Sequence, residues 1–220
     1  MGTDSKKTIL CYGDSNTYGY DPATGLRYPE QVRWPGVLRG MLPGHYVIEE
    51  GCNGRTASVT PEDEPWKDGR SYLKACLNSH KPIDLIILML GSNDLKKFFH
   101  RTPEEIAAGI REILQTIAEF TQEKQGSKPE VLLVSPPLIG RGIETSAFAD
   151  SFDADAVGRS EKLAALYEKE AKAFACSGVL KCGFLNAADV IQPSDIDSLH
   201  LMPDAHVRLA KAIYEAIDIS

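Results

Sequence analysis

Short apolar runs alternate with longer segments of helical periodicity along this chain, and this alternation is what most restricts its fold. Strands separated by helices predict a parallel sheet, because parallel neighbours need a crossover connection. Right-handed crossovers then place helices on both faces, so we expect an α/β fold, a three-layer α/β/α sandwich with a parallel five-stranded sheet. The expected strands are residues 8–12, 46–50, 85–90, 131–135 and 182–185, and the expected helices are residues 34–41, 70–80, 103–124, 157–176 and 203–217.

The length and charge of the chain narrow the class of protein. At 220 residues it suits one domain over residues 1–220, with residues 1–6 as a flexible N-terminus. The net charge of −7 argues against binding to nucleic acid or to an anionic membrane surface. No apolar run has the length of a membrane helix, and residues 1–7 lack the apolar region of a signal peptide, so we expect a cytoplasmic protein.

The five cysteines form an odd set without a pattern: Cys11, Cys52, Cys76, Cys176 and Cys182. No C-x-x-C pair occurs, and no cysteine is matched to a histidine at ligand spacing. We therefore expect reduced, mostly buried thiols, with neither a disulfide framework nor a metal site. A catalytic Cys52 is an alternative, because it lies in a loop after a strand, but no His–Asp pair selects it.

The first apolar run ends in Gly13-Asp14-Ser15-Asn16. A serine at such an exit can turn its hydroxyl and its backbone N–H toward the same point. Gly13 permits the tight turn, because without a Cβ it reaches backbone angles closed to other residues. We interpret Ser15 as a nucleophile; a helix N-cap is the alternative reading and is compatible with that role. Asp14 is expected to brace the loop.

Three further segments supply what a nucleophilic serine needs. Asp197 precedes His200 by three residues, so its carboxylate can accept the Nδ1–H and leave Nε2 to take the serine proton. Asn93 follows the third apolar run and can aim an amide N–H at a developing oxyanion. Gly54 follows the second run, where a bare backbone N–H can approach the same oxygen. Each segment also suits a simple turn. Together they predict a catalytic triad of Ser15, His200 and Asp197, with Gly54 and Asn93 as donors to the oxyanion.

In these motifs the chain resembles the SGNH (GDSL-type) hydrolases over nearly its whole length. The four residues that name that family fall on Ser15, Gly54, Asn93 and His200. The similarity is greatest to the intracellular bacterial arylesterase/acyltransferase branch, through the motifs at residues 9–15, 32–34, 48–51, 89–94, 101–103 and 134–137. The chain departs from the family at Asn16, where the motif has leucine, and this bears on the polarity of the acyl pocket.

The resemblance implies a flavodoxin-like SGNH hydrolase fold and a serine esterase or acyltransferase that acts on small, short-chain acyl or acetyl esters without a cofactor or metal. The backbone N–H groups of Ser15 and Gly54 and the Asn93 side chain would form the oxyanion hole. The alternatives are a carbohydrate acetylesterase and a catalytically silent ester- or sugar-binding module of the same fold. The expected partners are a small-molecule ester and, in a homo-oligomer, further copies of the chain.

Residues near the nucleophile suggest where a substrate would lie. The candidate substrate-binding residues are Asn16, Tyr18 and Asn53. An aryl or acyl pocket could be lined by Tyr18, Tyr20 and Trp34, with core packing as the alternative for Trp34, or walled by Leu138, Ile139 and Phe148. The loops at residues 18–32 and 140–156 are expected to wall the cleft or to make a subunit contact.

Two charged residues next to the candidate site have structural interpretations as well. We expect Arg55 to form a structural salt bridge, with a carboxylate of the substrate as its alternative partner. Asp94 directly follows Asn93 and is expected to be a local cap or a hydrogen-bond acceptor.

Overall fold

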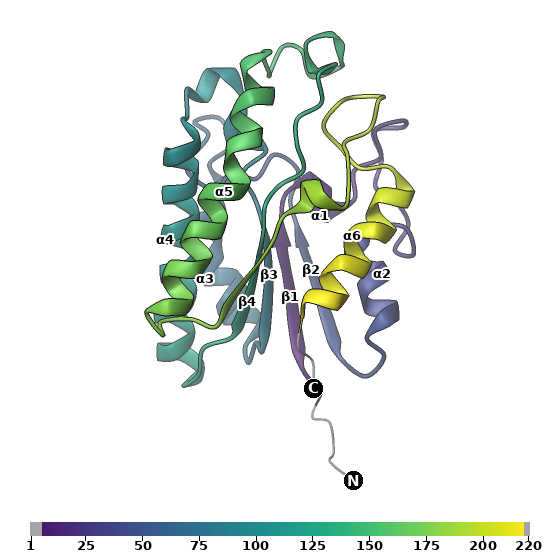
Figure 1. Cartoon of the computed structure of the whole chain (residues 1–220). Coiled ribbons are helices and arrows are strands. Elements are labelled where there is room, and N and C mark those ends of the chain that lie inside the picture. Colours follow the sequence, from purple (N-terminus) through teal and green to yellow (C-terminus); the bar gives the residue numbers. More distant parts are fainter. Residues whose placement is uncertain (1–5, 218–220) are drawn as a thin grey trace.

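The structure is a computed structural model that describes residues 6–217. Its centre is a five-stranded parallel sheet in the order β2-β1-β3-β4-β5 (Figure 1). The strands are β1 (Thr8–Gly13), β2 (Tyr46–Gly51), β3 (Leu85–Met89), β4 (Glu130–Val134) and β5 (Cys182–Leu185). The helices are α1 (Ser15–Tyr18), α2 (Trp34–Met41), α3 (Gly69–His80), α4 (Pro103–Gln125), α5 (Asp155–Cys176) and α6 (Pro203–Ala216). The predicted α/β fold with a parallel five-stranded sheet is confirmed.

Helices cover both faces of the sheet, as a three-layer sandwich requires. Helices α3, α4 and α5 lie on one face, and α2 and α6 on the other (Figure 1). Strand β3 shows how the sequence builds both cores: Ile86 and Leu88 pack with the first group, whereas Leu85, Ile87 and Met89 pack with the second. Because both faces of β3 are buried, the strand is apolar throughout rather than alternating.

The short helix α1 follows β1 directly and was not among the predicted helices. Its N-cap is Asp14, whose side chain accepts a hydrogen bond from the backbone N–H of Asn16 at 3.0 Å. Ser15 is therefore the first helical residue, and the alternative reading of Ser15 as the N-cap is wrong. Asp14 braces the turn instead, as expected.

The reason for glycine at position 13 also differs from the prediction. Gly13 does not have a positive φ, so unusual backbone angles are not what the position needs. A Cβ there would come within 2.1 Å of the Thr17 hydroxyl and 2.7 Å of the Met89 carbonyl oxygen. Glycine is required because α1 packs directly against the end of β1, which holds Ser15 close to the sheet.

Three further expectations concern the cysteines, membrane-spanning helices and the N-terminus. The five cysteines are free thiols, but only Cys11 and Cys76 are buried; Cys52 and Cys182 are half-buried and Cys176 is exposed. The expectation of mostly buried thiols is therefore wrong. Among residues 6–217 no helix is both long enough and apolar enough to cross a membrane. Most of the predicted flexible N-terminus, residues 1–5, lies outside the described residues, and the single-domain boundary stays a prediction.

Candidate active site

The candidate active site lies at the carboxyl ends of three neighbouring strands. Gly13, Gly51 and Met89 are register partners at the ends of β1, β2 and β3. Ser15 follows the first of these ends by two residues, and Gly54 and Asn93 follow the other two within four residues. Parallel sheets of this kind bind ligands outside the carboxyl edge of their strands.

The predicted triad residues form one hydrogen-bonded chain. His200 Nε2 lies 2.9 Å from Ser15 Oγ, and His200 Nδ1 lies 2.6 Å from Asp197 Oδ2. All three side chains are buried, with residue exposures of 7% for Ser15, 2% for Asp197 and 3% for His200. The segment between β5 and α6 therefore carries the acid and the imidazole to the serine at the end of β1.

A tight turn fixes the carboxylate of Asp197. Its Oδ1 accepts hydrogen bonds from the backbone N–H groups of Leu199 and His200, both at 3.0 Å, and from Ser194 Oγ at 2.8 Å. Burial opposes ionisation, but the hydrogen bonds from the side chain and backbone of His200 outweigh it and lower the pKa of Asp197 to about 2. The carboxylate is thus ionised and oriented before any substrate arrives.

The three predicted oxyanion donors follow the ends of β1, β2 and β3, and their role stays a prediction. The Ser15 N–H has no acceptor inside α1, because it belongs to the first residue of that helix. Gly54 has a φ of +81°, a conformation that favours glycine. Asn93 Nδ2 donates one hydrogen to the Arg55 carbonyl oxygen at 3.1 Å, which leaves its second hydrogen available.

Arg55 holds the Gly54 loop, although not as predicted. Its side chain is buried and carries no carboxylate partner among the described residues. Its guanidinium donates instead to the carbonyl oxygens of Gly13, at 3.0 Å, and Glu50, and it lies 4.3 Å from the centre of the Tyr12 ring. The expected structural salt bridge is wrong, because main-chain carbonyls at the ends of β1 and β2 take its place.

Asp94 holds the other side of the same loop. Its buried carboxylate accepts hydrogen bonds from the Ala57 N–H at 2.8 Å, the Ser58 N–H at 2.7 Å and Ser58 Oγ at 2.7 Å. These partners are more than 35 residues away in the sequence. Asp94 was expected to be a local cap or a hydrogen-bond acceptor. It is an acceptor, and its donors belong to a segment that is distant in the sequence.

The three candidate substrate-binding residues occupy different environments. Asn16 is buried, and its Nδ2 donates to the Leu199 carbonyl oxygen at 3.4 Å, so it ties α1 to the turn that carries the triad acid. Tyr18 is half-buried with the Arg27 guanidinium 4.4 Å from its ring centre. Asn53 is exposed in the loop before Gly54. None of these contacts tests binding of a substrate, so their assignment stays a prediction.

Two other aromatic residues lie nearest the imidazole. The ring centre of Tyr20 is 4.2 Å from that of His200, and the ring centre of Phe148 is 5.2 Å from it. Tyr20 comes from the loop after α1, and Phe148 from the loop between β4 and α5. Trp34, by contrast, is fully buried in the core beneath α2 and α6. Core packing, the alternative given for Trp34, is therefore confirmed, while pocket lining by Tyr20 and Phe148 stays a prediction.

A cavity of about 500 Å³ begins at the Gly54 loop. Its lining combines charged and aromatic side chains, including Glu64, Lys67, Lys96 and Phe98. Burial and the charge of Lys67 lower the pKa of Lys96. No sequence motif predicted this cavity, because its walls come from separate segments after β2 and β3.

The structure also brings together Glu50, Cys76 and His80, which were not among the predicted site residues. The statement that no cysteine has a histidine at ligand spacing is wrong. Cys76 and His80 are four residues apart on α3 and hence on one face of that helix. The signal that could have found them is this C-x-x-x-H spacing within a helical segment.

Comparison with known proteins places the chain in a family. The model of the GDSL-like lipase/acylhydrolase family matches residues 11–215, and the chain belongs to this family. This agrees with the SGNH resemblance, and the protein is a carboxylic ester hydrolase. A search of curated protein sequences gives no match.

Two solved structures illustrate the similarity. Est24, a carbohydrate acetylesterase from Sinorhizobium meliloti, is 35% identical, with 96% of this chain and 97% of that chain covered and a TM-score of 0.84. The aryl esterase of M. smegmatis is 33% identical, with 96% of this chain and 100% of that chain covered and a TM-score of 0.83. Both alignments cover 96% of this chain.

Proposed function

We propose that the protein cleaves small acetyl or short-chain acyl esters through an acyl-enzyme formed on Ser15. The observation that carries the proposal is the hydrogen-bonded chain from Ser15 Oγ through His200 to Asp197, with distances of 2.9 and 2.6 Å. In this mechanism Ser15 Oγ attacks the acyl carbonyl carbon while His200 Nε2 takes its proton. Asp197 keeps Nδ1 protonated and stabilises the imidazolium, which then protonates the leaving alcohol.

The oxyanion of the tetrahedral intermediate would be held by the N–H groups of Ser15 and Gly54 and by the Asn93 amide. Each donor is fixed before reaction: Ser15 by α1, Gly54 by Arg55 and Asn93 by its bond to the Arg55 carbonyl. Donors that need no reorganisation stabilise developing charge efficiently, and one such donor is worth about 10²–10³ in kcat.

Water, another alcohol or a peroxide would resolve the acyl-enzyme, with His200 now acting as the base. The close packing of Tyr20 and Phe148 against His200 supports acyl transfer beside hydrolysis, because aromatic walls bind an organic acceptor and displace water. The preference for short acyl groups is supported by Asn16, a buried amide next to the nucleophile where a long apolar groove would need an apolar side chain.

A carbohydrate ester is the second candidate substrate. The cavity beside Gly54 presents carboxylates, ammonium groups and the exposed ring of Phe98, a combination suited to a sugar with polar edges and apolar C–H faces. The similarity to a carbohydrate acetylesterase agrees with it, and the similarity to an aryl esterase agrees with a simple aryl acetate.

An active-site-directed phosphonate tests the proposal. It should add one phosphonyl group, located by peptide mass spectrometry on Ser15, and abolish hydrolysis of nitrophenyl acetate. Ser15→Ala is the matched control and should remain unlabelled while it keeps its fold. A wild-type protein that stays unlabelled and inactive on aryl and sugar acetates would instead be the silent binding module.

Cellular location and assembly stay predictions. The five free thiols support a reducing compartment such as the cytoplasm. The homo-oligomer is suggested by the long loops at residues 18–32 and 140–156, which are candidates for a subunit contact. The net charge of −7 argues against nucleic-acid binding.

A further inference from the structure

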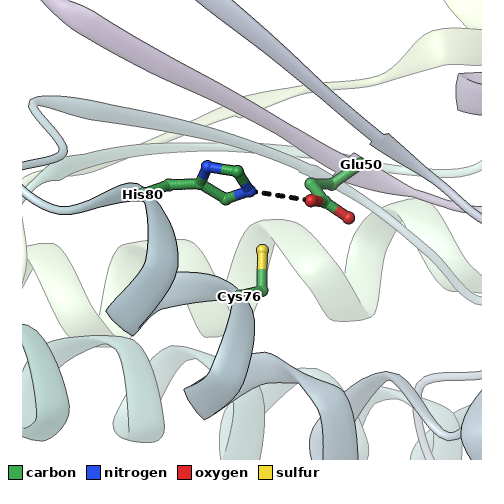
Figure 2. Close-up of side chains that lie close together, drawn as sticks. All are labelled: Glu50, Cys76 and His80. Atoms are coloured by element: carbon green, nitrogen blue, oxygen red, sulfur yellow. Dashed lines mark hydrogen bonds and ion pairs between the residues drawn. The ribbon is translucent and has the colours of Figure 1, made fainter.

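A second cluster of ligating side chains lies away from the triad, between β2 and α3. Figure 2 shows Cys76 and His80 on α3 with Glu50 of β2 facing them. His80 Nε2 and Glu50 Oε1 are 2.8 Å apart, and the nearest ligand atoms of all three residues lie within 4.8 Å of one another. No residue of this cluster belongs to the predicted catalytic machinery.

The sequence places these three groups together for simple reasons. Cys76 and His80 are separated by one helical turn and so project from one face of α3. Glu50 is two residues after Ile48, which packs in the same core as Cys76, so alternation along β2 turns Glu50 toward α3 as well. Cys76 is fully buried, whereas the side chains of His80 and Glu50 are 27% and 19% exposed. The cluster therefore opens to solvent on one side.

We propose that Glu50, Cys76 and His80 bind one zinc ion, with water as the fourth ligand. A thiolate, an imidazole and a carboxylate form a ligand set that zinc accepts and that calcium and magnesium do not favour. Around tetrahedral zinc, neighbouring ligand atoms are about 3.3–3.6 Å apart, from bond lengths of about 2.0–2.3 Å. The present spread of up to 4.8 Å closes to this geometry with side-chain shifts of about 1 Å.

The charges of the cluster fit a divalent cation. The carboxylate of Glu50 and the thiolate of Cys76 together neutralise the ion, so a partly buried site carries no net charge. Without metal, Cys76 is a free thiol. Binding breaks the S–H bond, forms the S–Zn bond and releases the proton to solvent, while His80 binds through the Nε2 lone pair.

Three other groups face the cluster: Tyr12 on β1, Tyr72 on α3 and the guanidinium of Arg55. Tyr72 Oη lies 3.5 Å from Glu50 Oε1 and can remain a hydrogen-bond donor to the carboxylate. Arg55 is the one neighbouring cation among them, and its guanidinium is held by the main-chain carbonyl of Gly13 at 3.0 Å. Its positive charge weakens metal binding but also favours the thiolate form of Cys76.

Cobalt substitution tests the site directly. Chelator-treated protein titrated with Co²⁺ should develop a near-ultraviolet sulfur-to-cobalt charge-transfer band that saturates at one ion per chain, and Zn²⁺ should remove it. Cys76→Ser should abolish that band. His80→Gln should weaken Co²⁺ binding by more than about 100-fold, because the loss of a direct ligand costs more affinity than the loss of a residue that only hydrogen-bonds to a ligand. Cys176→Ser and His100→Gln, which change an exposed cysteine and an exposed histidine, should leave the titration unchanged.

Fold and site effects are separated by circular dichroism and melting temperature in the absence of metal. His80→Gln changes a partly exposed side chain at the end of α3, so it keeps the test valid if Cys76→Ser does not fold. A wild-type chain without the charge-transfer band would overturn the proposal. So would a band that survives in His80→Gln at unchanged affinity, since the cobalt would then be held by another cysteine such as Cys52 or Cys182.

Discussion

Replacing Asn93 by alanine separates transition-state stabilisation from ground-state binding. Asn93 Nδ2 is the only side-chain donor of the three proposed oxyanion contacts, and the other two are backbone groups that the substitution leaves in place. The loss of one such donor costs about 10²–10³ in kcat, or roughly 3–4 kcal/mol. KM should change little, because the donor meets the oxyanion and not the ground-state carbonyl.

The same substitution also removes a structural hydrogen bond, and its effect on stability must be measured apart. Asn93 Nδ2 donates to the buried Arg55 carbonyl at 3.1 Å, so Asn93→Ala should lower the free energy of unfolding by about 1–3 kcal/mol. The assay is steady-state hydrolysis of nitrophenyl acetate at a temperature where urea unfolding shows the variant fully folded. Asn78→Ala, at an exposed position on α3, is the matched control. A raised KM with unchanged kcat would show that Asn93 binds the ground state and would refute this reasoning.

Three further predictions concern the triad and the substrate. Ser15→Ala and His200→Ala should each lower kcat by about six orders of magnitude, because the two residues act as a unit. Single-turnover rates of the double variant should fall little further. Additive losses would show that the two residues do not belong to one triad. On nitrophenyl esters of increasing acyl length, kcat/KM should peak between acetyl and butyryl. A longer acyl chain gains about 0.8 kcal/mol per buried CH₂ only where an apolar groove receives it. A kcat/KM that rises up to palmitoyl would contradict this prediction. The pKa of Asp197 is lowered to about 2, from about 3.9 in the unfolded chain. The ionised carboxylate therefore adds about 2 kcal/mol to the free energy of unfolding above pH 4, and this contribution is lost as the pH falls toward 2. Urea unfolding should show this loss in the wild type and not in Asp197→Asn.

The parts of the site that were predictable are those governed by local pattern. Ser15, Gly54 and Asn93 each follow an apolar strand, and parallel strands bring their carboxyl ends to one edge of the sheet. Asp197 and His200 were recognisable because their spacing of three residues forms one turn. In these cases a short segment determines the geometry, and the fold only has to align the segments.

The parts that were missed depend on contacts between distant segments. Phe148 was named as a possible wall residue, but its contact with the His200 ring, 52 residues further along the chain, could not be inferred because the Phe148 loop has no periodicity. Glu50 meets Cys76 and His80 only because α3 packs beside β2. The partners of Arg55 were mispredicted for a related reason: a sequence shows charged side chains, but it does not show which main-chain carbonyls the fold brings to a guanidinium.

Arg55 and Asp94 together hold the loop that carries Gly54, the proposed oxyanion donor. Burying a guanidinium and a carboxylate costs stability unless each is well hydrogen-bonded, and here the partners of both are largely main-chain groups. Arg55 ties the loop to the end of β1, and Asp94 holds it through the N–H groups of Ala57 and Ser58. Gly54, with its left-handed φ, directly precedes Arg55, so it lies between the end of β2 and these two attachments. The loop is therefore organised before the reaction begins, and the cost of ordering it is met in folding and not in the transition state.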